Sequence, residues 1–236
     1  MALYGMEDGM THDGVHEFTA DELTQIDDVV NGFLTQSGTP GAIVGLWIDE
    51  RGSLVKTYGV SNVETGTAPQ EADTFRIASN TKTFVATLLL QLVDEGLIGL
   101  ETPIGDFGFD FSGSEDATLA QLLGMTSGIF SYTEDEGFLT EYLADPMMPG
   151  FTPQDALEIA RKHEPYFAPG DGIHYSDTNT IIAGFIAEEL TGTTLPDALD
   201  ERIFPPRQLS ATSFPVGESA MPEPYLSGYL PPVGDK

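Results

Sequence analysis

The stretch "TFRIASNTKTFVATLLLQLVDEGLIGL", residues 74–100, places a serine and a lysine three positions apart at the start of a long apolar run. The apolar side chains would cover most sides of a helix, which predicts a buried helix. Ser79 and Lys82 then lie on one face of its first turn, because side chains at positions i and i+3 are neighbours. The stretch therefore predicts a core helix that carries two polar side chains in its first turn.

The Ser79–Lys82 pair is open to two interpretations. If Ser79 is a nucleophile, the free N–H groups of the first helical turn favour the negative charge that develops in acyl transfer, and a half-buried lysine can relay protons. Otherwise Ser79 caps the helix and Lys82 extends along the surface to water. The rarity of basic residues favours the first interpretation, since the chain has 9 Lys and Arg against 38 Asp and Glu.

Composition limits the class of protein. The chain has 236 residues, 40% of them apolar, which is enough for one large domain or two lobes. Its formal net charge of −29 repels nucleic acid and anionic lipid, so neither is an expected partner. Such an acidic surface is explained either by a need for solubility or by adaptation to high salt. The absence of cysteine excludes disulfides and thiolate metal sites. No apolar run is long enough to predict membrane insertion, and the N-terminus lacks a signal-peptide pattern, which leaves the compartment open.

Apolar periodicity predicts a helix, two strands and then a block of helices. The first helix covers residues 19–36, with Thr19 and Glu22 in a capping-box pattern. Residues 40–60 predict a β-hairpin with its turn at 49–52. The later helices are predicted at residues 84–93, 119–123, 152–163, 178–191 and 195–204.

The remaining charged groups predict no metal centre. His163 and His174 lack the spacing of metal ligands relative to the carboxylates, which favours surface histidines near helix ends. The stretch "YTEDEGFLTEYLAD", residues 132–145, could attract a hard cation, but without an EF-hand pattern it is interpreted as a solvated acidic loop. We therefore expect neither a metal nor an organic cofactor.

The stretch around Ser79 resembles the nucleophile region of the penicillin-recognising serine hydrolases, in the branch of class C β-lactamases, D-alanyl-D-alanine carboxypeptidases and related esterases. Four further segments resemble this family in the same order within residues 20–216. They are the hairpin at 40–66, "LLGMTSGI" at 122–129 with Met125 where His is usual, "APGDGIHYSDTNTIIAGFIAEELTG" at 168–192, and "RIFPPRQLSATSFP" at 202–215. The resemblance implies a β-lactamase/transpeptidase-like two-lobed fold, an α/β lobe plus an all-α lobe, with the active site between them.

The resemblance also implies roles for individual residues. Ser79 would be the acylated nucleophile, Lys82 its proton partner and Tyr175 a second proton-transfer group. Because a phenol titrates near pH ~10, a neighbouring ammonium would have to assist Tyr175 as a base. Tyr225 and Tyr229 are candidates for lining a substrate cleft, with ordinary loop tyrosines as the alternative.

Asp177 departs from the family pattern, which usually has Asn in Tyr-x-Asn. An Asn amide can donate to a substrate carbonyl, whereas an ionised Asp only accepts. We expect Asp177 to pair with Lys82, to favour the protonated lysine and to move the role of base toward Tyr175. This substitution favours an esterase-like or carboxypeptidase-like enzyme over an efficient β-lactamase. The alternative is that Asp177 serves only as an Asx-type helix cap.

A second departure concerns the family's third motif, Lys or His, any residue, then Gly, on a strand that supplies an oxyanion-hole N–H. Nothing after residue 192 fits it, and the family's C-terminal strands and last helix are expected to be missing from this chain. A second polypeptide could supply these strands, either as a nicked C-terminal piece or as a separate subunit. The alternatives are a truncated chain and a helical lobe that stands alone as a binding module. Of these we expect the second polypeptide, besides a small-molecule or short-peptide substrate.

Four segments are therefore expected: a flexible leader at 1–18, the first part of the α/β lobe at 19–78, a helical lobe at 79–210 and a returning loop at 211–236. The expected function is a serine hydrolase that forms an acyl-enzyme at Ser79 with esters, D-amino-acid peptides or amides, or β-lactams. The alternative is a catalytically silent penicillin-binding-like recognition module or fragment.

Overall fold

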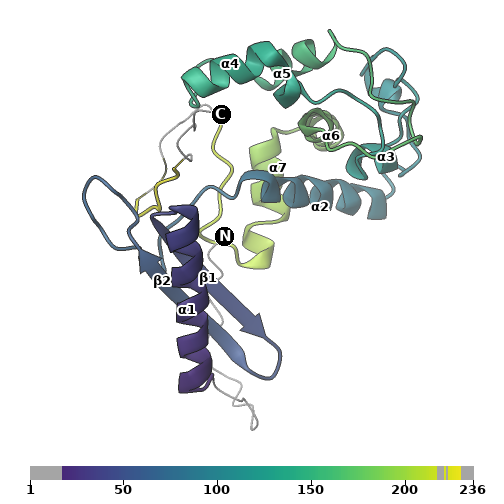
Figure 1. Ribbon diagram of the computed structural model, residues 1–236. Helices are drawn as coiled ribbons and strands as arrows, with labels where there is room; N and C mark the ends of the chain where they lie inside the picture. Colours follow the sequence, from purple (N-terminus) through teal and green to yellow (C-terminus); the bar gives the residue numbers. More distant parts are fainter. Residues whose placement is uncertain (1–17, 217–220, 222, 230–236) are drawn as a thin grey trace. The chain divides into compact units, whose positions relative to one another are not determined.

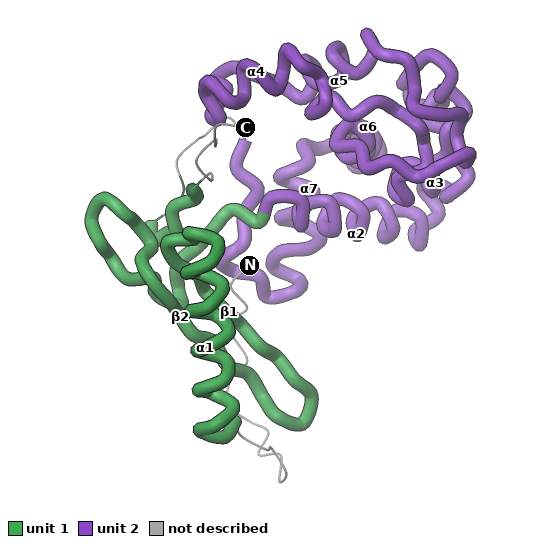
Figure 2. Tube along the Cα trace, in the orientation of Figure 1, with its two compact units in different colours: residues 1–77, 220–236 green, residues 78–219 purple. Residues whose placement is uncertain are grey.

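The computed structural model describes residues 18–216, 221 and 223–229, so the leader predicted for 1–18 lies, except for Phe18, outside the described residues. The chain forms two compact units (Figure 2). One contains residues 1–77 and 220–236, and the other contains residues 78–219. The predicted returning loop at 211–236 is shared between these units, and its described part forms neither a helix nor a strand.

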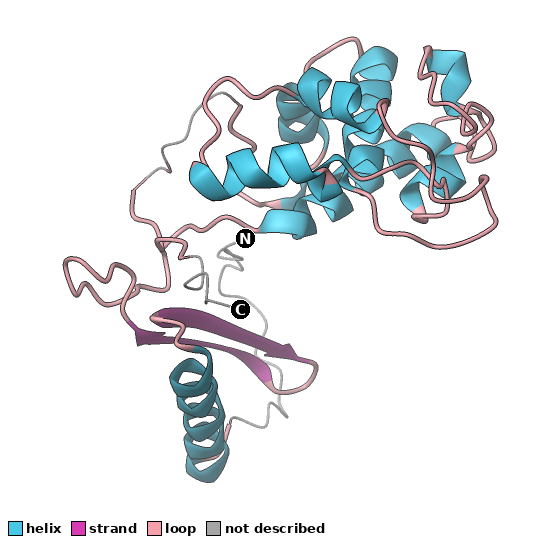
Figure 3. Cartoon of the chain, turned by 45° about the horizontal axis from the view of Figure 1, so that its top comes forward, coloured by secondary structure: helices cyan, strands magenta, loops and turns pink. Residues whose placement is uncertain are grey.

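The first unit contains one helix and a two-stranded antiparallel sheet, drawn in magenta in Figure 3. Helix α1 (Ala20–Ser37) begins with the predicted capping box of Thr19 and Glu22 and ends at Gly38, whose φ of 70° is left-handed. Strands β1 (Gly41–Ile48) and β2 (Gly52–Gly59) pair along their whole length, from Gly41 opposite Gly59 to Ile48 opposite Gly52. The predicted helix and hairpin are confirmed.

Polar contacts join α1 to the hairpin. The Arg51 guanidinium donates to both carboxylate oxygens of Glu22, at 3.0 and 2.8 Å. Asp27 accepts from Lys56 and, at 2.8 Å, from the Tyr58 hydroxyl. No side chain of α1 is fully buried, and apolar residues such as Ile26 and Val30 are half-buried on the side that faces β1, so the ion pairs accompany partial apolar contacts.

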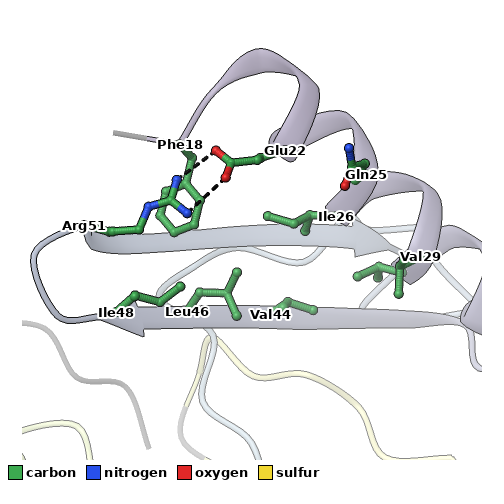
Figure 4. A pocket seen from close by; sticks show the side chains of 10 residues that line it. Phe18, Glu22, Gln25, Ile26, Val29, Val44, Leu46, Ile48 and Arg51 are labelled. Atoms are coloured by element: carbon green, nitrogen blue, oxygen red, sulfur yellow. Dashed lines mark hydrogen bonds and ion pairs between the residues drawn. The ribbon is translucent and has the colours of Figure 1, made fainter. Parts of the chain in front are cut away.

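A hollow of about 450 Å³ lies between α1 and β1 (Figure 4). Its β1 side carries Val44, Leu46 and Ile48, which alternate along the strand and therefore lie on one face of it. Nearby apolar side chains are exposed, among them Val29 at 72% and Trp47 at 55%. The first unit therefore presents an incompletely covered apolar surface.

The second unit is a helical bundle arranged around α6 (Asp177–Thr191). Figure 1 shows α6 nearly end-on, and the helices that contact it are α2 (Thr81–Asp94), α3 (Leu119–Leu123), α5 (Pro153–Ala160) and α7 (Leu195–Arg202). The shared core includes Leu88 and Leu92 of α2, Leu122 of α3, and Ile182 of α6, which are all 0% exposed. The broad apolar surface predicted for α2 is therefore buried, as its sequence required.

Helix boundaries follow local signals in most cases. Gly96 and Gly192 have φ values of 75° and 71° just beyond α2 and α6, where the sequence predicted their ends. Helix α5 is shorter than predicted, because it ends at Ala160 and not near His163. Beyond Ala160 the chain continues in tighter turns, in which the N–H groups of Lys162 and His163 donate to the carbonyls of Ile159 and Ala160.

The acidic segment 132–145 is helical over most of its length, so its prediction as a loop was wrong. It forms the short 3-10 turn η3 (Tyr132–Glu134) and then α4 (Glu136–Ala144). The Asp135 carboxylate caps α4 by accepting from the Phe138 N–H at 2.8 Å. The Phe138 ring packs against those of Tyr132 and Phe151, with centroids 4.9 and 5.2 Å apart. Capping and aromatic packing outweigh the high charge that suggested a solvated loop.

Three further 3-10 turns complete the described secondary structure: η1 (Ala78–Asn80), η2 (Ile104–Phe107) and η4 (Pro205–Arg207). Across the described part of the chain, every helix is too short or too polar to span a lipid bilayer.

Two leucines of α2 give a matched test of this core. Leu88 is fully buried, whereas Leu90, on the same helix, is 45% exposed. Leu88→Ala should lower the free energy of unfolding by about 2–5 kcal/mol, because it leaves a cavity. Leu90→Ala should change it by about 0.5 kcal/mol or less. Urea unfolding followed by far-UV circular dichroism measures both, and equal losses would contradict the assigned burial.

Candidate active site

Ser79 lies in the 3-10 turn η1, just before α2. Its predecessor Ala78 has a φ of 45°, a left-handed conformation that is uncommon for residues other than glycine and recurs at functional sites. The N-cap of α2 is Asn80, so the interpretation of Ser79 as the cap of this helix was wrong. The Ser79 side chain is exposed and engaged by two other groups.

The Ser79 hydroxyl receives two hydrogen bonds. The Tyr175 hydroxyl donates to Ser79 Oγ at 2.8 Å, and Lys82 Nζ donates to the same atom at 3.3 Å. Lys82 Nζ also lies 4.8 Å from the centroid of the Tyr175 ring. The fold therefore brings together the three residues expected to carry out proton transfer, although Tyr175 is 96 positions from Ser79.

Asp177 completes the cluster from the first position of α6. Its Oδ1 atom lies 2.5 Å from Lys82 Nζ, and its Oδ2 atom accepts from the Thr133 hydroxyl at 3.0 Å. The side chains of Lys82 and Asp177 are 20% and 25% exposed. The N-cap of α6 is Ser176, so Asp177 is not the cap and its carboxylate is used in tertiary contacts.

The ion pair determines the charge of Lys82. Burial acts to lower the pKa of Lys82, but the hydrogen bond to Asp177 and the neighbouring Tyr175 outweigh it, so this pKa is raised above its ordinary value. Lys82 is therefore an ammonium at neutral pH and donates to Ser79. Among the described residues, the other side chain that contacts Ser79 Oγ is Tyr175, whose hydroxyl donates to it.

A turn that the sequence did not single out supports Tyr175 and Asp177. Ser131 Oγ accepts from the Asp177 N–H at 3.0 Å, and Glu134 Oε1 lies 3.0 Å from His174 Nε2. The Tyr166 hydroxyl first, and His174 after it, hold the pKa of Glu134 below its ordinary value. The only sequence signal for these residues is a pair of hydroxyls two positions apart in an acidic stretch, which is too common to be informative.

Both histidines that were predicted at the surface contact residues 130–135 or Tyr166. His163 stacks on Phe130 with centroids 3.8 Å apart and pairs with Asp135 at 2.9 Å. His174 stacks on Tyr166 at 3.6 Å. Their partners are thus rings and carboxylates of the same unit.

Tyr225 and Tyr229 lie in the other compact unit. Tyr225 forms an isolated parallel bridge with Thr74, and the Tyr229 hydroxyl accepts from the Val63 N–H at 2.8 Å. Their side chains are 36% and 42% exposed. Their expected role in a substrate cleft stays a prediction.

Comparison with known proteins agrees with this geometry. The sequence profile of the family described as Beta-lactamase matches residues 26–233. Penicillin-binding protein 4 of Amycolatopsis lactamdurans is 35% identical over 179 residues, which cover 73% of this chain and 44% of that protein.

Two solved structures extend the comparison. A D-stereospecific amidohydrolase from Streptomyces sp. superposes with a TM-score of 0.73 and 36% identity, covering 82% of this chain and 57% of that one. A D-amino acid amidase from Ochrobactrum anthropi SV3, complexed with D-phenylalanine, gives a TM-score of 0.68 and 26% identity, covering 79% and 50%. The chain thus spans about half the length of these relatives.

The charge state of Lys82 can be measured directly. Asp177→Asn should lower the pKa of Lys82, because burial then acts without the carboxylate that opposes it. Titration of ¹³C-labelled lysine by NMR follows this pKa, and the chain has four lysines to assign. Asp200→Asn, at an exposed position of α7, removes the same charge and should leave Lys82 unchanged. An equal shift in both variants would show that the effect is one of net charge alone.

Proposed function

Because the chain belongs to the β-lactamase family, the penicillin-recognising serine hydrolases, we propose that Ser79 forms an acyl-enzyme that water then hydrolyses. One observation carries this proposal: the Tyr175 hydroxyl and the Lys82 ammonium both contact Ser79 Oγ, at 2.8 and 3.3 Å. A nucleophile needs a group within hydrogen-bond reach to take its proton, and a second group to orient the first.

The contacts support a specific division of labour. To act as the base, Tyr175 first gives its own hydroxyl proton to solvent. As Ser79 Oγ then bonds to the substrate carbonyl carbon, the serine proton passes to the Tyr175 phenolate oxygen. The Lys82 ammonium, held by Asp177, stabilises this anion. The proton then passes from Tyr175 to the leaving group as the bond to the carbonyl carbon breaks. In the second half of the reaction Tyr175 takes a proton from water as the water oxygen bonds to the acyl carbon. It returns this proton to Ser79 Oγ as the bond between Oγ and the acyl carbon breaks.

We propose esters and D-amino-acid amides or peptides as substrates, ahead of β-lactams. The two related structures are a D-stereospecific amidohydrolase and a D-amino acid amidase. Asp177 supports placing esters ahead of β-lactams, because its carboxylate cannot donate to a peptide or β-lactam carbonyl as an Asn amide would. Its two oxygens already accept from Lys82 and Thr133.

A second polypeptide that supplies further strands remains part of the proposal. Three or more strands are normally needed for a stable sheet, whereas the hairpin of the first unit has two among the described residues. The exposed Val29 and Trp47 support additional covering structure in this unit.

The acyl-enzyme is tested by intact mass after incubation with a nitrophenyl ester and, separately, with a fluorescent penicillin. The ester should add one acyl group to the wild-type protein and none to Ser79→Ala, because the nucleophilic oxygen is gone. Ser53→Ala, at another exposed serine, should label like the wild type. The same spectrum reveals any co-purifying chain. No adduct and no turnover, with or without such a chain, would favour the silent recognition module.

The substrate order is tested with Asp177→Asn. Restoring an amide donor should raise the rate of β-lactam acylation relative to ester acylation by about tenfold, the effect of one added hydrogen bond. Acylation rates of the two probes are compared in the same preparation, so a partial loss of folded protein cancels in the ratio. An unchanged ratio would contradict the proposed effect of Asp177.

A further inference from the structure

Thr133 contacts Asp177 on the side opposite Lys82. Asp177 Oδ1 lies 2.5 Å from Lys82 Nζ, and Oδ2 accepts from Thr133 Oγ1 at 3.0 Å. A carboxylate can turn about its terminal torsion, which is broad and roughly two-fold. With one oxygen held by the ammonium and the other by the hydroxyl, this rotation is opposed at both ends.

The hydroxyl protons can be assigned by counting. An ionised Asp177 accepts only, so the proton of Thr133 must lie on its bond to Oδ2. Thr133 Oγ1 and Ser131 Oγ are 2.8 Å apart, so the proton between them must come from Ser131. The Ser131 oxygen then remains free to accept from the Asp177 N–H at 3.0 Å. Each donor in this ring of bonds has one acceptor.

The fold holds Thr133 in place independently of Asp177. On one side, the Ser131 N–H donates to the Tyr166 hydroxyl at 3.1 Å. On the other, Glu134 pairs with His174 and Asp135 caps α4. The hydroxyl of Thr133 is thus presented by an anchored turn, which makes it suited to orient a neighbour.

We propose that Thr133 is a positioning residue, which fixes the Asp177 carboxylate so that the Lys82 ammonium stays directed at Ser79. The inference rests on the proposed function, in which Asp177 holds the Lys82 ammonium. It adds Thr133, a residue that does not touch the reacting atoms. Loss of the hydroxyl frees one carboxylate oxygen to water and loosens the ion pair. Thr133 therefore affects Ser79 only through Asp177 and Lys82.

The decisive measurement is the titration of Lys82 in Thr133→Val, which replaces the hydroxyl by a methyl group of similar size. The groups that face Lys82 are Asp177 from α6, Tyr175 before it and Tyr132 from η3. We expect the pKa of Lys82 to fall by about half a unit, roughly threefold in the protonation equilibrium, and by less than in Asp177→Asn. Thr133→Ser keeps the hydroxyl and should restore the wild-type titration.

A double-mutant cycle separates positioning from general destabilisation. In the Asp177→Asn background, Thr133→Val should cause no further shift in the pKa of Lys82. Thr133 acts on the ammonium only through the Asp177 carboxylate, which this background already lacks. Thr140→Val is the matched control, since the Thr140 hydroxyl bonds only to the backbone of its own helix, at Glu136. Thr133→Ala serves as a second hydroxyl-free variant should valine prevent folding.

An unshifted titration in Thr133→Val, or an equal shift with and without the Asp177 carboxylate, would overturn the inference. In ester turnover the expected signature is a lower kcat with little change in KM, since substrate binding is not touched. The NMR measurement needs no turnover. A Lys82 shift without any Ser79 adduct would therefore reject the proposed function and leave the positioning role intact.

Discussion

The ion pair of Lys82 with Asp177 is the contact on which the rest of the site depends. It joins the first turn of α2 to the first turn of α6, and these two helices also share the core of their unit. Burial acts to lower the pKa of Lys82, but the hydrogen bond to Asp177, together with the neighbouring Tyr175, outweighs burial and raises this pKa. The lysine is thereby a fixed cation that donates to Ser79 and lies beside Tyr175. With a neutral residue at position 177, burial would be the main influence on the pKa of Lys82 and would act to lower it.

A wall built from residues 130–135 gives this pair its geometry. The wall combines hydroxyls that bind Asp177 with carboxylates that bind histidines, and its rings stack in the order His163, Phe130, Tyr166 and His174. In a chain of net charge −29, these acidic residues are therefore more than a solubilising surface. Glu134 and Asp135 have lowered pKa values because hydroxyl, backbone or histidine donors reach them. Such anchoring is what a catalytic group needs if its rotamer is to be held near a productive geometry.

The two units are stabilised by different means. The helical unit buries leucine and isoleucine side chains around α6 on nearly all of its sides. The first unit holds α1 to its hairpin through Glu22 and Asp27, and it leaves apolar surface beside a hollow. The helical unit therefore has its own core, whereas the first unit gains little from apolar burial among its described residues.

The hairpin, the helices with clear apolar periodicity, and the candidates Ser79, Lys82 and Tyr175 could be predicted from the sequence, because they rest on spacings of a few residues or on motifs. The sequence also indicated that Asp177 would pair with Lys82. Three features became apparent only in the folded chain: Ser79 is not a cap, the acidic segment 132–145 contains a helix, and Thr133 binds Asp177. Thr133 and Asp177 are 44 positions apart. Local patterns describe neighbours within a turn or a strand, whereas such contacts arise only when packing brings distant segments together.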